Sequence, residues 1–184
     1  EFSTVTDGTE SLDLALTVTS GNATFAGTVS TEGIVFPATQ VASADPNTLD
    51  DYEEGTWTPV VADSSTTGTE ASITLVAARQ TYTKIGRQVT VNFSISNIDT
   101  TGLTSGNAVY IRGLPFVSSS TNLTRGVLAA SEVTFSGTIG TTVSVSDSWM
   151  TLSETTTGAT VNSIKVSDLT STTADLNGAI TYEV

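Results

Sequence analysis

The sequence predicts an all-β protein in which an intertwined N-terminal β stalk precedes an antiparallel β-sandwich of the jelly-roll kind. Ser and Thr supply 23 and 37 of the 184 residues. Thr suits a pleated, half-buried surface and Ser suits turns. Apolar and polar residues alternate along many short segments, which indicates strands with one buried face. Long stretches of Ala, Leu, Glu and Lys are absent, so no helix longer than about two turns is expected.

Residues 3–40 contain several short runs with a strand pattern. In the clearest of them, Leu12, Leu14 and Leu16 alternate with polar or small side chains. Such strands offer one apolar face and few partners within one chain, and an isolated hairpin is marginally stable in water. Symmetric copies would bury these faces together. We therefore expect this segment to form an intertwined oligomeric stalk.

Charge divides the chain into two parts. Residues 1–56 hold ten acidic residues and no Lys or Arg, whereas residues 57–184 hold nine acidic and six basic residues. A polar connector over residues 38–54 lies at the end of the acidic part. We therefore expect a stalk and linker over residues 1–50, followed by a head domain over residues 51–184.

The head shows a dense series of strand patterns after Trp57. The clearest strand runs from Val89 to Ile95, with apolar side chains at every second position, and residues 180–184 repeat this pattern. Many short strands at such spacing are typical of a sandwich or barrel, and we expect a jelly roll. Further strands are expected at residues 71–76, 79–85, 108–112, 126–135, 142–146, 148–153 and 160–166.

The chain contains neither Cys nor His, and its formal net charge is −13. Disulfides, thiolate or imidazole metal sites and His-dependent catalytic groups cannot be built from it. Six scattered Lys and Arg form no basic patch for nucleic-acid phosphates or anionic membranes. The apolar runs are too short to span a membrane. We expect no nucleic-acid partner, no membrane insertion, no cofactor and no enzymatic activity.

Residues 36–59 read FPATQVASADPNTLDDYEEGTWTP. This segment resembles a linker common in tail fibres and tail spikes of tailed bacteriophages, where it joins a repetitive shaft to a C-terminal β-domain. The segments YTKIG at residues 82–86 and IRGLPF at residues 111–116 match the same pattern in the same order, and residues 21–29 look like phage shaft sequence. The resemblance is weak from residue 117 to 175 and returns faintly at residues 178–182.

The resemblance implies a homotrimeric, receptor-binding fibre tip at the distal end of the virion, outside the host cell. The rest of the fibre would precede it, and its partner would be a bacterial surface polysaccharide or another outer-surface receptor. In such fibres the most distal domain usually contacts the host, so specificity is expected after residue 116. Two alternatives stay open. One is a domain that trimerises and caps the fibre without receptor contact, and the other is the non-catalytic C-terminal part of a polysaccharide depolymerase spike.

Trp149 is the leading candidate for a carbohydrate site. An exposed ring can stack on the C–H face of a sugar while short polar side chains bond its hydroxyl groups, and Asp147 and Ser148 precede Trp149 directly. In a strand, Met150 and Leu152 point away from Trp149 and could occupy the core. The alternative is that Trp149 itself lies on the core side or at a subunit interface.

Tyr110 and Arg112 form a second candidate, because they share one face of a predicted strand between apolar neighbours. An exposed Tyr–Arg pair suits an acidic or hydroxylated glycan, and the alternative is a solvated strand face. Trp57 is expected to be a packing anchor between stalk and head.

The carboxylates Asp50, Asp51, Glu53 and Glu54 are the strongest candidates for binding a cation, since calcium takes several oxygen ligands. Their spacing lacks the order of a calcium loop. We expect a solvated acidic run and no metal site.

Overall fold

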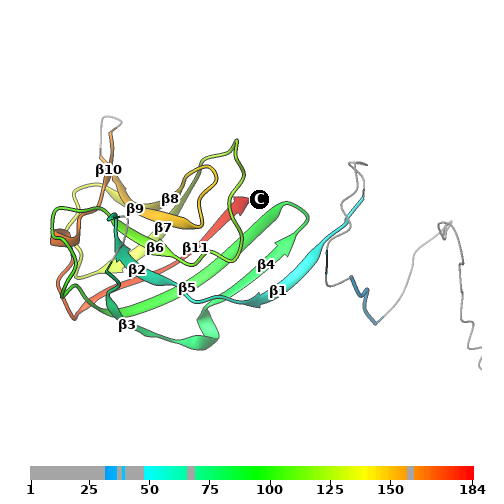
Figure 1. Cartoon of the computed structure of the whole chain (residues 1–184), viewed down its shortest axis with the longest axis horizontal. Helices are drawn as coiled ribbons and strands as arrows, with labels where there is room; N and C mark the ends of the chain where they lie inside the picture. The colour runs from blue at the N-terminus through cyan, green and yellow to red at the C-terminus, as the bar shows by residue number, and fades with distance from the viewer. Residues whose placement is uncertain (1–31, 37–38, 40–47, 66–68, 157–159) are drawn as a thin grey trace, which may run out of the picture. The chain divides into compact units, whose positions relative to one another are not determined.

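The computed structural model describes residues 32–36, 39, 48–65, 69–156 and 160–184. The chain divides into two compact units, Glu1–Val35 and Phe36–Val184, and all the strands described below belong to the second (Figure 1). The stalk predicted over residues 3–40 falls outside the described residues except for 32–36 and 39. The stalk and the domain boundary at residue 50 therefore stay predictions.

The described part of the chain is all-β, as predicted, and forms a curled antiparallel sheet of eleven strands. Its helical elements are two 3-10 turns, η1 (Ala77–Arg79) and η2 (Val166–Asp168). The strands in chain order are β1 (Tyr52–Thr56), β2 (Val60–Asp63), β3 (Ser72–Leu75), β4 (Thr81–Ile85), β5 (Gln88–Asp99), β6 (Val109–Arg112), β7 (Thr124–Ser131), β8 (Thr138–Val143), β9 (Trp149–Thr155), β10 (Val161–Ser163) and β11 (Ala174–Glu183).

The sheet order is β1-β4-β5-β11-β7-β8-β9-β6-β2, with β10 added to β9 and β3 to β5. Glu70, just before β3, forms a bridge with Ala62 of β2. Strand β2, the last in this order, thus approaches β3, which itself pairs with β5. The sheet therefore curls back on itself. The β1–β4 ribbon runs out from one side of this curl (Figure 1).

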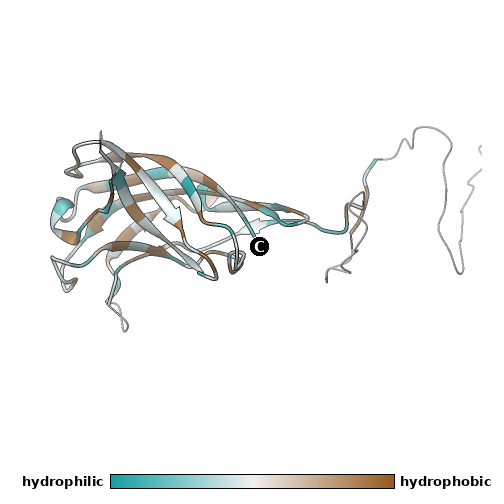
Figure 2. Cartoon of the chain, turned by 90° about the horizontal axis from the view of Figure 1, so that it is seen from above, coloured by the Kyte–Doolittle hydropathy of each residue, from teal (hydrophilic) through white to brown (hydrophobic). Residues whose placement is uncertain are grey.

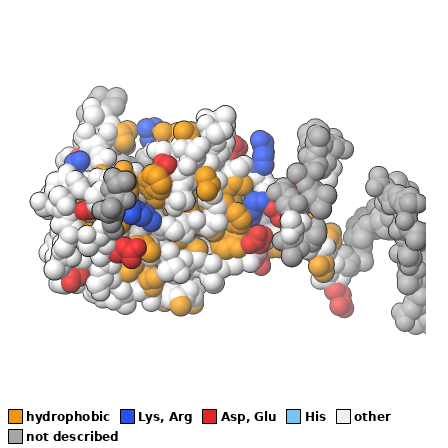
Figure 3. Space-filling view, in the orientation of Figure 1, with side chains coloured by type: hydrophobic (Ala, Val, Ile, Leu, Met, Phe, Trp, Pro, Cys, Tyr) orange, Lys and Arg blue, Asp and Glu red, His pale blue; other side chains and the backbone are white. Residues whose placement is uncertain are grey.

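The alternation read in the sequence sorts the side chains between the two faces of the sheet. Val89, Val91 and Ile95 of β5 are fully buried, whereas Thr90 is half-buried and Asn92 is exposed. Hydrophobic residues correspondingly recur at intervals along the strands (Figure 2). The outward positions are rich in Ser, Thr and Asn, so charged side chains are sparse and scattered on the face shown in Figure 3.

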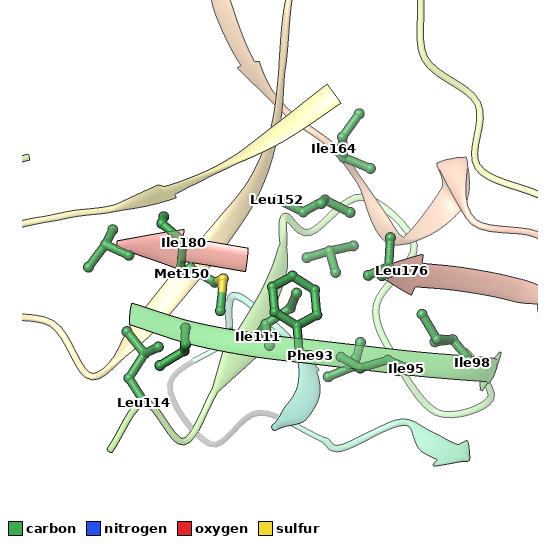
Figure 4. Close-up of a cluster of buried hydrophobic side chains, with 14 of the residues drawn as sticks. Phe93, Ile95, Ile98, Ile111, Leu114, Met150, Leu152, Ile164, Leu176 and Ile180 are labelled. Carbon is green, nitrogen blue, oxygen red and sulfur yellow. The ribbon is translucent and has the colours of Figure 1, made fainter. Parts of the chain in front are cut away.

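The core lies between the two halves of the curl. Buried side chains from β5, β6, β9 and β11 converge there, among them Phe93, Ile111, Leu152 and Leu176 (Figure 4). Burial of such a side chain contributes about 1.5–3 kcal/mol. Trp57 joins this core, because its ring meets Phe93 edge-on at 6.3 Å between ring centroids.

Two strands, β1 and β2, were not predicted. Glu53, Glu54 and Gly55 are poor strand formers, so β1 reads as part of the acidic connector. The structure also shifts the strand expected at residues 142–146 to β8. Ser146 adopts φ 59°, a left-handed conformation that belongs in a turn, and this turn separates β8 from β9.

Candidate functional site

Three of the five predicted site residues share the outer face of β6 and β9. In the β6–β9 ladder, Arg112 pairs with Trp149 on the outer face. Ile111 pairs with Met150 on the inner face. Ile111 and Met150 are fully buried, whereas Tyr110, Arg112 and Trp149 are half-buried. The shared face of Tyr110 and Arg112 is therefore confirmed, and Trp149 lies on the same side, away from the core.

These three side chains form a stack, called the aromatic cluster below. The rings of Trp149 and Tyr110 are stacked, with centroids 5.9 Å apart and planes inclined by 20°. The guanidinium carbon of Arg112 lies 5.9 Å from the Tyr110 ring centroid, within the range of a cation–π contact. The cluster thus presents partly exposed aromatic surface beside a positive charge.

Backbone carbonyls hold Arg112 in place. Its Nη2 donates hydrogen bonds of 3.1 Å to the carbonyl oxygens of Asp63 and Ser65. The acceptors are the last residue of β2 and a residue of the loop that follows it, and β2 pairs with β6. The guanidinium is therefore positioned before any ligand arrives.

The segment that holds Arg112 is itself fixed by the buried carboxylate of Asp63, which is 1 % exposed. This carboxylate accepts hydrogen bonds from the backbone N–H of Thr104 at 2.8 Å, the backbone N–H of Ser65 at 2.9 Å and the Ser65 hydroxyl. The hydrogen bonds from Ser65 and Thr104 hold the pKa of Asp63 well below its usual range. Sequence reasoning missed this residue, because nothing in a lone Asp at a strand end reveals a partner in a distant loop.

Asp147 and Ser148 lie in the loop between β8 and β9, and a neighbouring loop supports them. Ser118 donates its backbone N–H to the Asp147 carbonyl at 2.9 Å, and its hydroxyl oxygen accepts from the Asp147 N–H at 2.9 Å. Leu114 N–H donates to the Ser148 carbonyl at 3.0 Å. Burial raises the pKa of the Asp147 carboxyl. The two loops therefore fix the backbone that leads into Trp149, and Ser118 is a second positioning residue that sequence reasoning missed.

A row of hydroxyl side chains continues the outer face away from the aromatic cluster. Across β6, β9, β8 and β7, the register aligns Tyr110 with Thr151, Thr151 with Thr142, and Thr142 with Arg125. Thr142 and Thr151 are called the threonine row below, and Arg125 lies at its far end. A shallow groove of about 450 Å³ adjoins the row at Arg125, and Ser153 is also among its lining residues. This face offers hydroxyl groups, two aromatic rings and two guanidinium groups.

The acidic run before and within β1 does not converge on one point. Lys84 forms a buried ion pair with Asp51, and the Tyr82 and Tyr52 hydroxyls donate to Glu53 and Glu54. Among the residues that the structure describes, no group of three or more acidic side chains is arranged to hold a metal ion.

No protein-family model matches the chain, and no curated protein sequence matches it. In the described ranges, no helix is long and apolar enough to cross a membrane. What the protein does is therefore inferred from its own residues.

Proposed function

We propose that this chain is the receptor-binding tip of a bacteriophage tail fibre, which attaches the virion to a glycan of the bacterial surface and catalyses no reaction. The observation that carries the proposal is the aromatic cluster of Tyr110, Trp149 and Arg112 on a face otherwise rich in hydroxyl groups. The linker-like segment at residues 36–59 supports the same function, because it resembles the linkers of such fibres.

The cluster has the chemistry that sugar binding requires. The partly exposed rings of Trp149 and Tyr110 offer apolar surface for the C–H face of a sugar. Arg112 and the hydroxyls of Thr142 and Thr151 supply donors and acceptors for the sugar's polar groups. Because Arg112 is already fixed by two carbonyls, little side-chain freedom is lost on binding.

A homotrimeric assembly would suit such a shallow site. In this proposal, residues 1–50 of three chains intertwine, and each chain presents a head of the sandwich or jelly-roll kind at the end of the fibre. Weak individual sugar contacts then add, because linked sites experience a high effective concentration of ligand.

A glycan array probed with the full chain tests the proposal. Wild-type protein is expected to bind host surface glycans, and Trp149→Ala to lose most of this binding. Phe135→Ala is the matched control, because Phe135 is an exposed aromatic residue outside the aromatic cluster. The proposal fails if the wild type binds neither host glycans nor host cells.

Deletion of residues 51–184 separates attachment from the alternative of a structural cap. If the remaining segment still trimerises and only host binding is lost, the head serves attachment. If trimerisation is lost as well, the head has the capping role. Release of reducing ends from host capsule would show an enzymatic activity instead and would contradict binding without catalysis.

A further inference from the structure

A second guanidinium group lies on the same outer face as the aromatic cluster. Arg125 of β7 is exposed and stands at the far end of the threonine row from Tyr110. The ion pair found among the described residues joins Lys84 and Asp51, both outside this face. Neither Arg112 nor Arg125 is therefore neutralised by a salt bridge in the part of the chain that the structure describes.

The outward positions of β6, β9, β8 and β7 carry no carboxylate, whereas the neighbouring β11 carries Asp175 and Glu183 on this side. The register places Thr138, Gly140 and Thr142 of β8 opposite Thr155, Ser153 and Thr151 of β9. Glu154 of β9 belongs to the other face, because it pairs with the buried Ile139, and its carboxylate accepts from the Ser136 N–H at 2.7 Å. Carboxyl groups border these four strands at Asp147 in the loop before Trp149, at Glu70 opposite Ala62 of β2, and at Glu183 of β11, which accepts from the Asn122 side chain.

A positive face is unusual in this protein, because the whole chain has a net charge of −13. Such a net charge repels anionic ligands at long range. The four strands β6, β9, β8 and β7, with two guanidinium groups and no outward carboxylate, lower that repulsion locally. Its charge is complementary to an anion, and guanidinium groups bind carboxylate and phosphate with paired hydrogen bonds.

The distance between the two arginines indicates an extended ligand. Their strands, β6 and β7, are separated by β9 and β8. With about 4.8 Å between neighbouring strands, the two strands lie about 14 Å apart. This distance exceeds one sugar ring, so a single sugar cannot reach both groups. Between the arginines, Thr142 and Thr151 supply hydroxyls suited to the uncharged part of a chain of sugars.

We propose that the outer face binds an anionic glycan of several sugars, with one subsite at the aromatic cluster and a second at Arg125 in the adjoining groove. This inference rests on the proposed glycan-binding function and adds the charge class of the ligand and the second subsite. The negative groups are carboxylates or phosphates of the glycan. The threonine row carries the chain between the two subsites.

The test measures binding of the full chain to polymers that differ in charge. Polygalacturonate oligosaccharides supply carboxylates, their carboxyl-reduced counterparts supply a neutral chain of the same sugar backbone, and a glycerol-phosphate polymer supplies phosphates. We expect binding to at least one anionic polymer, weakened by added salt, and at least tenfold weaker binding to the carboxyl-reduced chain than to the carboxylate form if carboxylates are the recognised groups. Preference for the phosphate polymer would identify phosphates instead, and either result supports the inference.

The matched variants are Arg125→Gln and Arg87→Gln. Both residues are exposed arginines, but Arg87 lies in the β4–β5 turn, outside the outer face. Arg125→Gln is expected to weaken binding of the anionic polymer about tenfold, the effect of losing one charged hydrogen bond, and Arg87→Gln to leave binding unchanged. Poly-glutamate tests whether charge alone suffices, and it should bind far more weakly than the glycans.

Equal weakening by the two variants would overturn the inference, and so would a result in which neither anionic polymer binds more tightly than the neutral chain. Strong poly-glutamate binding would do so too. These results leave the proposed function intact if Trp149→Ala still abolishes binding of a host glycan. Absence of any glycan binding by the wild type would contradict both the inference and the proposed function.

Discussion

At the scale of single residues, two buried polar groups hold surface loops in place. Asp63 anchors the segment whose carbonyls fix Arg112. Tyr182 fixes the loop after β6, because its hydroxyl donates to the Phe116 carbonyl at 3.0 Å and accepts from the Phe116 N–H at 3.3 Å. Each group can affect ligand binding through the loop that it holds, without touching the ligand itself.

Asp63→Ala tests the first anchor. The variant removes the buried carboxylate that accepts from the N–H groups of Ser65 and Thr104, so the free energy of unfolding should fall by about 1–3 kcal/mol. Urea denaturation measures this loss, and Glu70→Ala, at an exposed carboxylate nearby, serves as control. Glycan binding should weaken as well, because the carbonyls that hold Arg112 shift. Unchanged stability would contradict the role given to Asp63.

The same carboxylate predicts a pH dependence. The pKa of folded Asp63 lies below its unfolded value of about 3.8. The ionised form is therefore favoured by folding, and its stabilisation is present above that unfolded value and is lost as the pH falls towards the folded pKa. The stability difference between wild type and Asp63→Ala should accordingly shrink below about pH 4, as thermal melts at several pH values would show.

Tyr182 predicts a loss of stability at alkaline pH, whereas Asp63 predicts a loss at acid pH. Burial raises its pKa to about 12, against a small lowering by the hydrogen bond with Phe116. The neutral phenol is favoured in the folded state, so its contribution is full below about pH 10 and is lost as the pH rises through 12. Tyr182→Phe should remove this alkaline contribution and cost about 1–2 kcal/mol at neutral pH. Denaturation curves at pH 8 to 12, compared between the two proteins, measure both effects.

At the scale of secondary-structure elements, β1 is the most exposed part of the described sheet. It pairs with β4 alone. Beyond the ladder, it is held by the Asp51–Lys84 ion pair and by the Tyr82 ring, which packs over Gly55. Lys84 also lies 5.5 Å from the Phe116 ring centroid, and burial lowers its pKa. One ion pair thus joins β1 to the body of the sheet.

Breaking this pair should release the strand. Asp51→Asn leaves Lys84 buried without its partner carboxylate and should cost about 3–5 kcal/mol. Hydrogen exchange is expected to accelerate first at the β1 amides, before the amides of β5 respond. The double variant Asp51→Leu/Lys84→Met should recover most of the loss, because an apolar pair has no charge to desolvate. A single variant as stable as the wild type would show that the pair is unimportant.

Gly140 tests the close approach of β7 and β8. A Cβ at this position would lie 2.4 Å from the carbonyl oxygen of Gly126, and a backbone atom cannot rotate away as a side chain can. Gly140→Ala should therefore lower the free energy of unfolding by about 1–3 kcal/mol. Calorimetry would detect the loss, and Gly106→Ala, at a site open to solvent, should change little. The threonine row depends on the same ladder.

The sequence predicts elements well where local periodicity decides them. Strand β5 and the shared face of Tyr110 and Arg112 follow from a period of two. Asp63 and Ser118 were not predictable, because their partners are 41 and 29 residues away along the chain. Strand β1 was missed because its residues are poor strand formers and its pairing partner, β4, lies far along the chain. The proximity of Trp149 to Tyr110 likewise depends on the pairing of β6 with β9.

At the scale of the whole molecule, the proposed trimer makes the stalk a determinant of affinity. A chain of residues 51–184 should sediment as a monomer and bind a glycan-coated surface more weakly than the full chain, by a factor of 10² or more from lost avidity. Its affinity for a soluble single-site oligosaccharide should be unchanged. Equal binding of both forms to the surface would argue against a multivalent tip.

The position of β1 has a mechanical consequence. A force applied at Tyr52 along the axis of β1 would draw this strand past β4. The hydrogen bonds of an antiparallel ladder lie across the strands, so such a pull loads the five residue pairs between β1 and β4 in shear, together instead of one after another. The buried Asp51–Lys84 pair lies at the end where the load enters. Strand β1 is thus oriented to resist a force along its axis, although it pairs with one strand alone. Its lifetime under load is governed by the rate of forced unfolding.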